Sequence, residues 1–270
     1  MLKDITIGQY FPGKSFLHRL DPRVKIILTI GYIVMLFVAL SPGGLAVSVL
    51  FLVVCYGVSR IPPRMVFKSL KPVVPIILFT AVLNMFFVDG DPLFKWWIFK
   101  ITREGLSTAL LMAVRIICLI AGTSLLTYTT SPIVLTDGIE RLLSPLKRLK
   151  LPVHELAMMM TIALRFIPTL IEETDKIMSA QKARGADLET GGLMQRAKAL
   201  IPILIPLFVS AFRRADELAL AMECRCYRGG EGRTRMKQLK ITGADIAACV
   251  IMTITLAGIF FMNQILPPLA

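Results

Sequence analysis

The sequence predicts an all-α integral membrane protein with about five transmembrane helices and three amphipathic helices at the cytoplasmic side or interface. Hydrophobic residues make up 55% of the 270 residues, and the mean hydropathy of +0.69 exceeds that of a soluble domain with one packed core. Lys and Arg number 31 against 18 Asp and Glu, and this excess lies between long apolar runs. Basic segments between apolar runs are typical of the cytoplasmic loops of membrane proteins.

The first two predicted spans form a helical hairpin. Residues 26–40 carry no charge, a Ser-Pro-Gly-Gly turn follows at 41–44, and residues 45–58 are again uncharged. Each run is shorter than the roughly 20 residues of an untilted span. Either the flanking Arg23, Lys25 and Arg60 extend their side chains to the interface, or the hairpin lies in a thin region of the membrane. A buried hairpin in a soluble core is the alternative, and the further apolar runs argue against it.

Three more apolar runs complete the predicted spans. They cover residues 72–88, residues 105–128 with Arg115 near the middle, and residues 244–266 with Asp245 near the start. A charge is costly against lipid, so the Arg115 side chain is expected to face protein, headgroups or water.

The charges of the loops predict the orientation of the chain. The turn at 41–44 is uncharged, whereas four cations crowd the loop after the second span: Arg60, Arg64, Lys68 and Lys71. The N-terminus is therefore expected in the cytoplasm, and five spans place the C-terminus outside. The loop at 89–104 carries Trp96 and Trp97, as expected of an outer interfacial belt.

Residues between the fourth and last spans are predicted to form amphipathic cytoplasmic helices. The first is expected over 133–149. The apolar runs 156–171 and 199–212 could pass as short spans, which would give seven spans with the same orientation of both ends. Each run continues into dense charges, so we interpret them as halves of two long helices instead. The predicted organisation has three parts: 1–128 with four spans, 129–242 with the coupling helices, and 243–270 with the last span.

Both long helices are predicted to end in an arginine between small residues. These ends are Ala183-Arg184-Gly185 and Cys224-Arg225-Cys226. A cation at the negative end of the helix dipole, with a following glycine as left-handed cap, explains both without any partner. A slim tip with a forked donor also fits a carboxylate in the groove of a partner protein. The residues alone favour neither explanation.

Other residues have a structural explanation beside a functional one. Asp21 is placed to cap a helix that begins at Pro22, with Arg23 and Lys25 as headgroup anchors. The methionines Met158, Met159 and Met160 form an adaptable apolar patch, and Pro202 and Pro206 should bend their helix. Ordinary packing explains these residues most simply, whereas contact with a partner is the functional alternative.

Two motifs suggest chemistry that the rest of the chain does not support. Residues 8–15 fit the letters of a nucleotide-binding P-loop, but a P-loop needs a preceding strand and an α/β domain, and membrane spans follow here. The Cys224 and Cys226 pair has no second Cys or His pair to complete a zinc site. No catalytic residue, metal or cofactor is expected in this chain, and nucleic acid is not an expected partner.

Several motifs together resemble one family. They are G-Q-Y-x-P-G-x-S from Gly8, H-R-L-D-P-R-x-K from His18, A-L-R-F-I-P at 163–168, the Arg184 tip, and E-C-R-C-Y-R-G-G-E-G-R-T from Glu223. Essentially the whole chain resembles the transmembrane T component of energy-coupling factor (ECF) transporters, the CbiQ/EcfT family. Lys14 stands where relatives are expected to have Asp or Asn, and Cys224 replaces the usual first alanine of the second arginine motif.

The resemblance implies a non-catalytic subunit of an ATP-driven importer in the bacterial plasma membrane. Its implied partners are two cytoplasmic ABC-type ATPases, which bind ATP and Mg, and a membrane-embedded S component that binds a vitamin or transition-metal ion. The two arginine motifs are expected to dock in grooves of the ATPases. The implied contacts with the S component are Met158, Met159, Met160, Pro202 and Pro206. A stand-alone secondary transporter is the alternative, and a scaffold unrelated to transport is a third possibility.

Overall fold

The computed structural model describes residues 10–87, 92–96, 99–149, 151–186, 192–229 and 238–265. The chain divides into two compact units. The bundle unit comprises residues 8–138 and 238–270, and the hairpin unit comprises residues 1–7 and 139–237. The described residues are almost entirely helical, and several helices are long and apolar enough to cross a membrane, so the predicted all-α membrane fold is confirmed.

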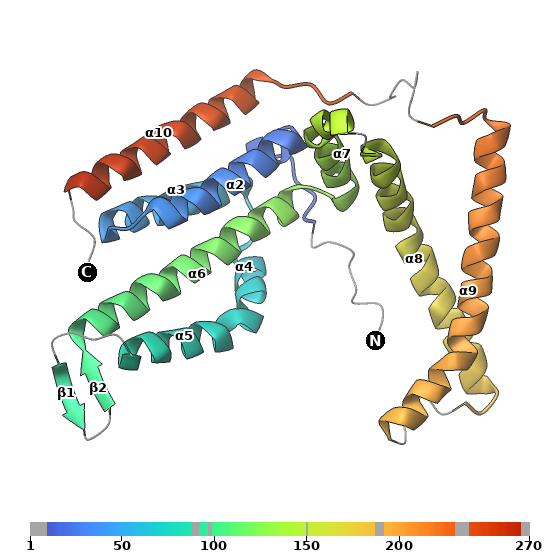
Figure 1. Ribbon diagram of the computed structural model, residues 1–270, viewed down its shortest axis with the longest axis horizontal. Helices are drawn as coiled ribbons and strands as arrows, with labels where there is room; N and C mark the ends of the chain where they lie inside the picture. The colour runs from blue at the N-terminus through green and yellow to red at the C-terminus, as the bar shows by residue number, and fades with distance from the viewer. Residues whose placement is uncertain are drawn as a thin grey trace. The chain divides into compact units, whose positions relative to one another are not determined.

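The bundle unit consists mainly of helices that run back and forth alongside one another (Figure 1). Its elements are α1 (Phe16–Arg19), α2 (Pro22–Val38), α3 (Pro42–Ser59), α4 (Pro63–Leu70), η2 (Lys71–Val73), α5 (Val74–Phe87), β1 (Pro92–Trp96), β2 (Phe99–Thr102), α6 (Arg103–Thr129), the first part of α7 (Pro132–Leu142), and α10 (Gly243–Ile265).

The predicted helical hairpin at the start of the chain is confirmed. The Asp21 carboxylate accepts a hydrogen bond from the backbone N–H of Arg23 at 2.9 Å, and Pro22 occupies the first position of α2. The hydroxyl of Ser41 accepts from the N–H of Gly44 at 3.1 Å and caps α3 in the same way. Each helix thus begins where a polar cap precedes a proline.

Among the described residues, five helical segments are long and apolar enough to span a membrane. The number agrees with the prediction, but one of the five segments is not a predicted span. Four are α3, the continuous segment from α4 to α5, α6 and α10. The fifth is α8 (Val153–Ala183), which lies in the part of the chain predicted to hold the coupling helices. The predicted first span, α2, has 17 residues and falls short of that length, although it packs against α3, α6 and α10.

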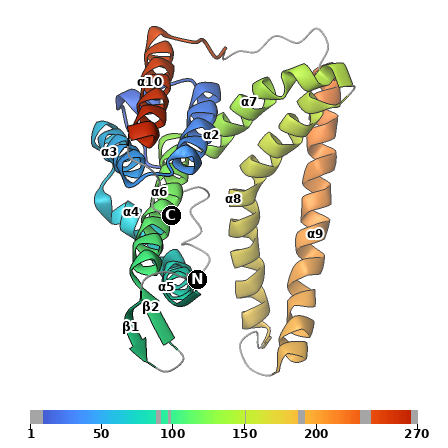
Figure 2. The same cartoon turned by 60° about the vertical axis from the view of Figure 1, so that its left-hand side comes forward.

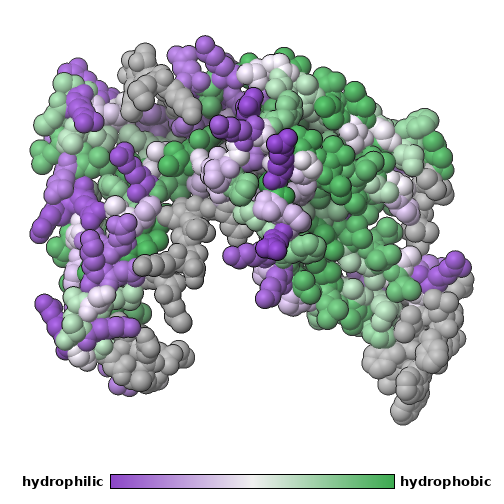
Figure 3. All heavy atoms as spheres, turned by 180° about the vertical axis from the view of Figure 1, so that it is seen from behind, coloured by the Kyte–Doolittle hydropathy of each residue, from purple (hydrophilic) through white to green (hydrophobic). Residues whose placement is uncertain are grey.

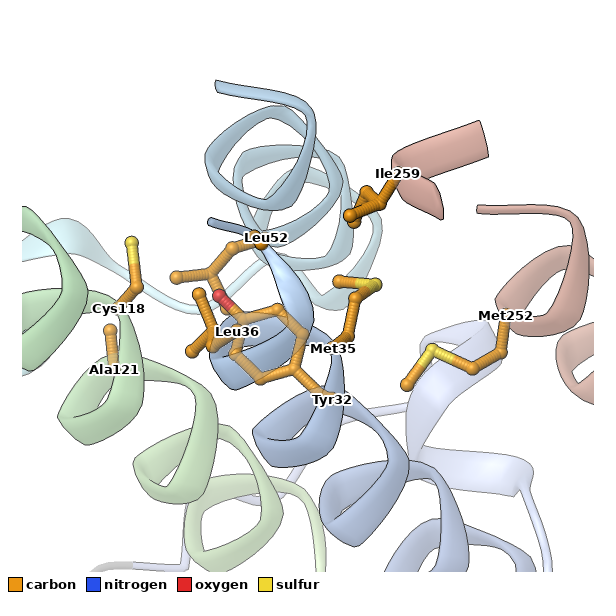
Figure 4. Packing of buried hydrophobic residues seen from close by; sticks show 9 residues of the cluster. Tyr32, Met35, Leu36, Leu52, Cys118, Ala121, Met252 and Ile259 are labelled. Carbon is orange, nitrogen blue, oxygen red and sulfur yellow. The ribbon is translucent and has the colours of Figure 1, made fainter. Parts of the chain in front are cut away.

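The core of the bundle unit surrounds α2. Figure 4 shows Tyr32, Met35 and Leu36 of α2 between side chains of α3, α6 and α10. The Tyr32 ring lies against Gly122 of α6, where an added Cβ would stand 2.6 Å from the ring atom Cδ1. The absence of a side chain at Gly122 is what lets α2 and α6 approach closely.

Large hydrophobic side chains also cover the outside of the bundle unit. In Figure 3 they form a broad apolar area on the face shown. α5 has no buried residue, and its Leu78 and Phe79 are 66% and 63% exposed. Exposed apolar surface of this extent fits a bilayer as solvent and not water.

A short antiparallel β-hairpin replaces part of the loop that was predicted between the third and fourth spans. β1 pairs with β2, with Trp96 opposite Phe99. Trp97, the other member of the predicted belt, and the acids Asp89 and Asp91 lie outside the described residues.

The hairpin unit holds the end of α7, η3 (Ser144–Leu149), α8 and α9 (Leu193–Cys224). The single helix predicted over 133–149 is wrong, because the chain leaves the α-helix after Leu142 and continues as a 3-10 turn. Pro145 explains the break, since it lacks an N–H and disfavours a helical residue before it. The two long amphipathic helices that were predicted correspond to α8 and α9.

Candidate functional site

The arginine at the end of α8 stands on a complete Schellman cap. The N–H of Gly185 donates to the carbonyl of Lys182 and the N–H of Ala186 donates to that of Gln181, each at 3.0 Å. Gly185 has φ +84°, which a residue without Cβ adopts freely. The C-cap residue itself is Arg184, and residues 183–185 are all exposed. The cap therefore ends the helix abruptly and leaves the guanidinium at its tip.

The end of α9 repeats this backbone with different residues. The N–H of Cys226 donates to the carbonyl of Glu223 at 2.8 Å, and the N–H of Tyr227 donates to that of Met222 at 3.0 Å. Arg225 is the C-cap, and residues 224–226 are exposed. The left-handed residue is Cys226, with φ +56°, so the predicted glycine cap is wrong for this helix. A non-glycine residue in this conformation costs about 1 kcal/mol.

The two arginine tips lie at opposite ends of an antiparallel pair of helices. Gln181, near the end of α8, donates to the carbonyl of Pro202, in the first half of α9, at 3.1 Å. Figure 2 shows α9 returning alongside α8 from the end at which α8 stops. At 1.5 Å per residue, the 32 residues of α9 place its tip about 48 Å from its start. Two tips so far apart fit two separate docking sites better than one.

A polar contact near the middle of both helices fixes their register. The carboxylate of Glu173 accepts hydrogen bonds from the Ser210 hydroxyl and from Nη2 of Arg214, the latter at 2.8 Å. The side chains of Arg214 and Glu173 are 35% and 21% exposed, so water screens the ion pair only in part. Sequence reasoning missed this contact, because the spacing of charges on one helix does not reveal their partner on another.

The apolar residues proposed for partner contact do not form one patch. Met159 and Met160 are 55% and 44% exposed near the start of α8, and Met158 is half-buried. Pro202 and Pro206 are exposed in the first half of α9, inside an uninterrupted helix that bends in this part in Figure 1. Because the helices are antiparallel and Pro202 lies opposite residue 181, about 33 Å of helix separates the two groups.

Asp21, Arg23 and Lys25 belong to a buried polar cluster at one end of the bundle unit. Nε and Nη2 of Arg23 donate to the two Asp21 oxygens at 3.0 and 2.8 Å. The backbone N–H of Asp21 donates to the Asp245 carboxylate at 2.8 Å, which also accepts from the N–H and the hydroxyl of Thr242, each at 2.7 Å. This cluster joins the starts of α2 and α10.

Lys25 does not extend to the interface as predicted. Only 7% exposed, it donates from Nζ to the carbonyls of Thr129 at 3.0 Å and His18 at 3.2 Å and to the Thr130 hydroxyl at 3.2 Å. The carboxylates thus lie at the positive starts of two helices and the ammonium at the negative end of α6, as helix dipoles favour. These residues connect α2 with α1, α6 and α10 in addition to capping α2.

The residues that match the P-loop pattern pack and hydrogen-bond with His18 just before α2. The Ser15 hydroxyl lies 2.6 Å from Nδ1 of His18, and Nε2 lies 3.0 Å from the Phe11 carbonyl oxygen. A Cβ on Gly13 would meet the His18 ring at 2.7 Å. The helix that follows, α1, is only four residues long. Gly8 and Gln9 lie outside the described residues.

A second group of polar contacts closes the other end of the bundle. Nη2 of Arg115 donates to the carbonyl of Ala39 at 2.7 Å, so this side chain faces protein, one of the three environments expected for it. The side chain of Asn263 accepts from the Ser41 hydroxyl at 2.9 Å and donates to the Val38 carbonyl at 2.6 Å. The turn between α2 and α3 is thus held by α6 and α10. The only sequence signal for Asn263 was a polar residue within an apolar run.

Comparison with known proteins gives consistent matches over nearly the whole chain. Residues 13–236 match the CbiQ family, described as cobalt transport protein. The chain is 59% identical over 261 residues to a protein of Clostridium kluyveri, 53% over 265 residues to one of Ruminiclostridium cellulolyticum, and 48% over 264 residues to one of Bacillus subtilis. These alignments cover 95, 98 and 97% of this chain and 97, 99 and 100% of the relatives. All three relatives are described as energy-coupling factor transporter transmembrane protein EcfT.

Proposed function

This chain belongs to the EcfT/CbiQ family of transmembrane T components of ECF transporters, and from that premise we propose that its two arginine tips seat two cytoplasmic ATPases. The family is a non-catalytic, multi-pass membrane subunit, so ATP hydrolysis belongs to partner subunits. ATP and Mg would then be bound by these ATPases.

The observation that carries this proposal is the equivalence of the two tips. Arg184 and Arg225 are both C-cap residues, each followed by a left-handed residue that closes the same pair of hydrogen bonds. Neither guanidinium pairs with an acid among the described residues. Each offers a forked donor that binds a carboxylate through two parallel hydrogen bonds. The separation of about 48 Å along α9 supports one ATPase at each tip.

The third proposed partner is a membrane-embedded S component that carries the substrate, a vitamin or a transition-metal ion. Exposed apolar side chains on the two long helices support it, including Met159 and Met160 of α8 and Phe208 and Phe212 of α9. Apolar surface of this extent on helices that also carry many charges suits contact with a second protein. Since Met158–Met160 and Pro202–Pro206 lie far apart, we propose two separate contact regions for this partner.

We propose a separate role for the membrane parts and for the coupling-helix part of the chain. Residues 1–128 and 243–270 hold the chain in the membrane, and residues 129–242 transmit motion from the ATPases. ATP-driven closure of the ATPase pair would move the tips of α8 and α9, and these stiff helices would pass the movement to the S component. We propose a cytoplasmic N-terminus and an external C-terminus.

Affinity purification from native membranes in mild detergent tests this assembly. Two nucleotide-binding subunits and a small membrane protein should co-purify with the wild-type chain. Arg184→Glu/Arg225→Glu should lose both ATPases and the ATPase activity, because charge reversal turns each carboxylate contact into repulsion. The matched control is Lys176→Glu/Arg213→Glu, which reverses two exposed cations on the bodies of the same helices and should keep the complex.

Two results would contradict the proposal. Equal retention of the ATPases by the tip variant and the control would show that the arginine tips do not seat them. A wild-type chain that purifies alone and binds a solute would instead make it a stand-alone secondary transporter.

A further inference from the structure

From the α9 tip we infer that Cys224 and Cys226, while this tip is undocked, form a site of reversible S-thiolation by anionic low-molecular-weight disulfides, which prevents the tip from docking on its ATPase. The inference rests on the proposed docking function and adds a means of regulating it. It concerns only one of the two tips, because Ala183 and Gly185 flank the arginine of the other.

The exposure of the five cysteines separates this pair from the others. Cys224 and Cys226 are exposed, whereas Cys118 is buried and Cys55 and Cys249 are half-buried in helices of the bundle unit. Thiol–disulfide exchange requires access of the attacking sulfur to the disulfide. The two thiols at the tip are therefore the ones that a soluble disulfide reaches first.

The charge around the pair favours an anionic reagent. Among the described residues 223–229, the cations Arg225 and Arg228 outnumber the single acid, Glu223. A local excess of positive charge raises the concentration of anions near the thiols. A carboxylate-bearing adduct would also pair with the Arg225 guanidinium and compete with a carboxylate of the partner.

The tip geometry makes an adduct disruptive. The Schellman cap fixes the backbone of Cys224 and Cys226 on either side of Arg225, so an adduct on either thiol stays beside the arginine whichever χ1 rotamer it adopts. Each added group would widen a tip whose flanking side chains are small. Cys226 is already held at φ +56°, a conformation that a non-glycine residue adopts at a cost.

The chemistry is balanced and reversible. The thiolate of Cys224 or Cys226 attacks one sulfur of the disulfide, the new protein–sulfur bond forms as the old S–S bond breaks, and the other half leaves as a thiolate. The proton of the protein thiol passes to that leaving group through solvent. The protein sulfur is oxidised and the departing half is reduced, and excess thiol reverses the exchange.

The test uses the full-length chain in detergent with oxidised glutathione as the probe. Intact-mass and peptide analysis should find the adduct at Cys224 or Cys226 and not at Cys55, Cys118 or Cys249. Association with the purified ATPase pair should weaken by about tenfold or more and recover after treatment with dithiothreitol. The Cys224→Ala/Cys226→Gly variant should associate equally with and without the probe, whatever its own starting affinity.

The outcomes separate this inference from the docking proposal. An adduct at the tip with unchanged association, or no adduct at either tip cysteine, overturns the inference and leaves the docking proposal standing. An unmodified wild-type chain that fails to bind the ATPases overturns both.

Discussion

Gly122 is a position where one missing side chain determines how two helices pack. A Cβ there would stand 2.6 Å from Cδ1 of Tyr32, which is 4% exposed in the core. Gly122→Ala should therefore destabilise the protein by about 1–3 kcal/mol through overpacking, as measured by thermal unfolding in detergent. The control is Gly57→Ala in α3, where nothing beyond the neighbouring backbone of α3 itself lies within 4 Å of the added Cβ. Equal melting temperatures for the two variants would contradict the packing argument.

His18 should make stability depend on pH. Burial lowers its pKa, the bond to the Phe11 carbonyl opposes this shift, and the charge of Lys25 adds to it. A histidine with a lowered folded pKa contributes fully above its unfolded pKa of about 6.5, and this contribution is lost as pH falls from there through the folded pKa. The slope in that window is at most about 1.4 kcal/mol per pH unit.

Unfolding at pH 7.5 and pH 5.5 measures this effect. The wild type should lose more stability between these values than His18→Gln, which lacks the titrating group. The same loss in both proteins would assign the pH dependence to other groups.

At the scale of elements, Lys25 connects helices that are distant in sequence. It bonds the end of α6 and the residue after it, Thr130, and also the carbonyl of His18 in α1. Lys25→Met should cost about 2 kcal/mol or more, because it leaves buried acceptors without a donor. Lys68→Met, at an exposed lysine of α4, is the control. A loss of stability no greater than that of the control would mean that the cluster does not hold the bundle end together.

The limits of sequence reasoning differ from one element to another. The start of α2 was predicted correctly because the cap at Asp21 and the proline after it are local signals. The break after Leu142 was not predicted, although Pro145 is a local signal for it, because apolar residues continue beyond the break.

Contacts between distant elements were not predictable from local patterns. The bond from Asp21 to Asp245 joins residues 224 positions apart, and no local pattern encodes such a pairing. For the same reason, the two arginine tips were visible in the sequence but their placement at opposite ends of a hairpin was not. The left-handed Cys226 was unexpected because glycine is the usual residue at that position.

At the scale of the whole molecule, the two termini should lie on opposite sides of the membrane. This is expected from the basic loop after α3 and from the five crossings that the sequence predicts. An alkaline phosphatase fused at the C-terminus should be active, because it folds outside the cytoplasm. A green fluorescent protein fused at the same place should stay dark. Fusion after Gly229 should give the reverse pattern, and a fluorescent C-terminal fusion would contradict an external C-terminus.

The tips of α8 and α9 differ in sequence, which has a consequence for the symmetry of the ATPase pair that we propose to dock on them. A pair of identical subunits presents two identical grooves related by a two-fold axis. In the docking that we propose, this single chain would present two different tips to them, one bordered by Ala183 and Gly185 and the other by Cys224 and Cys226. Docking on both would give each copy a fixed, distinguishable position. Selection could then act on the two grooves separately, so a duplicated ATPase gene has a structural reason to diverge into two specialised subunits.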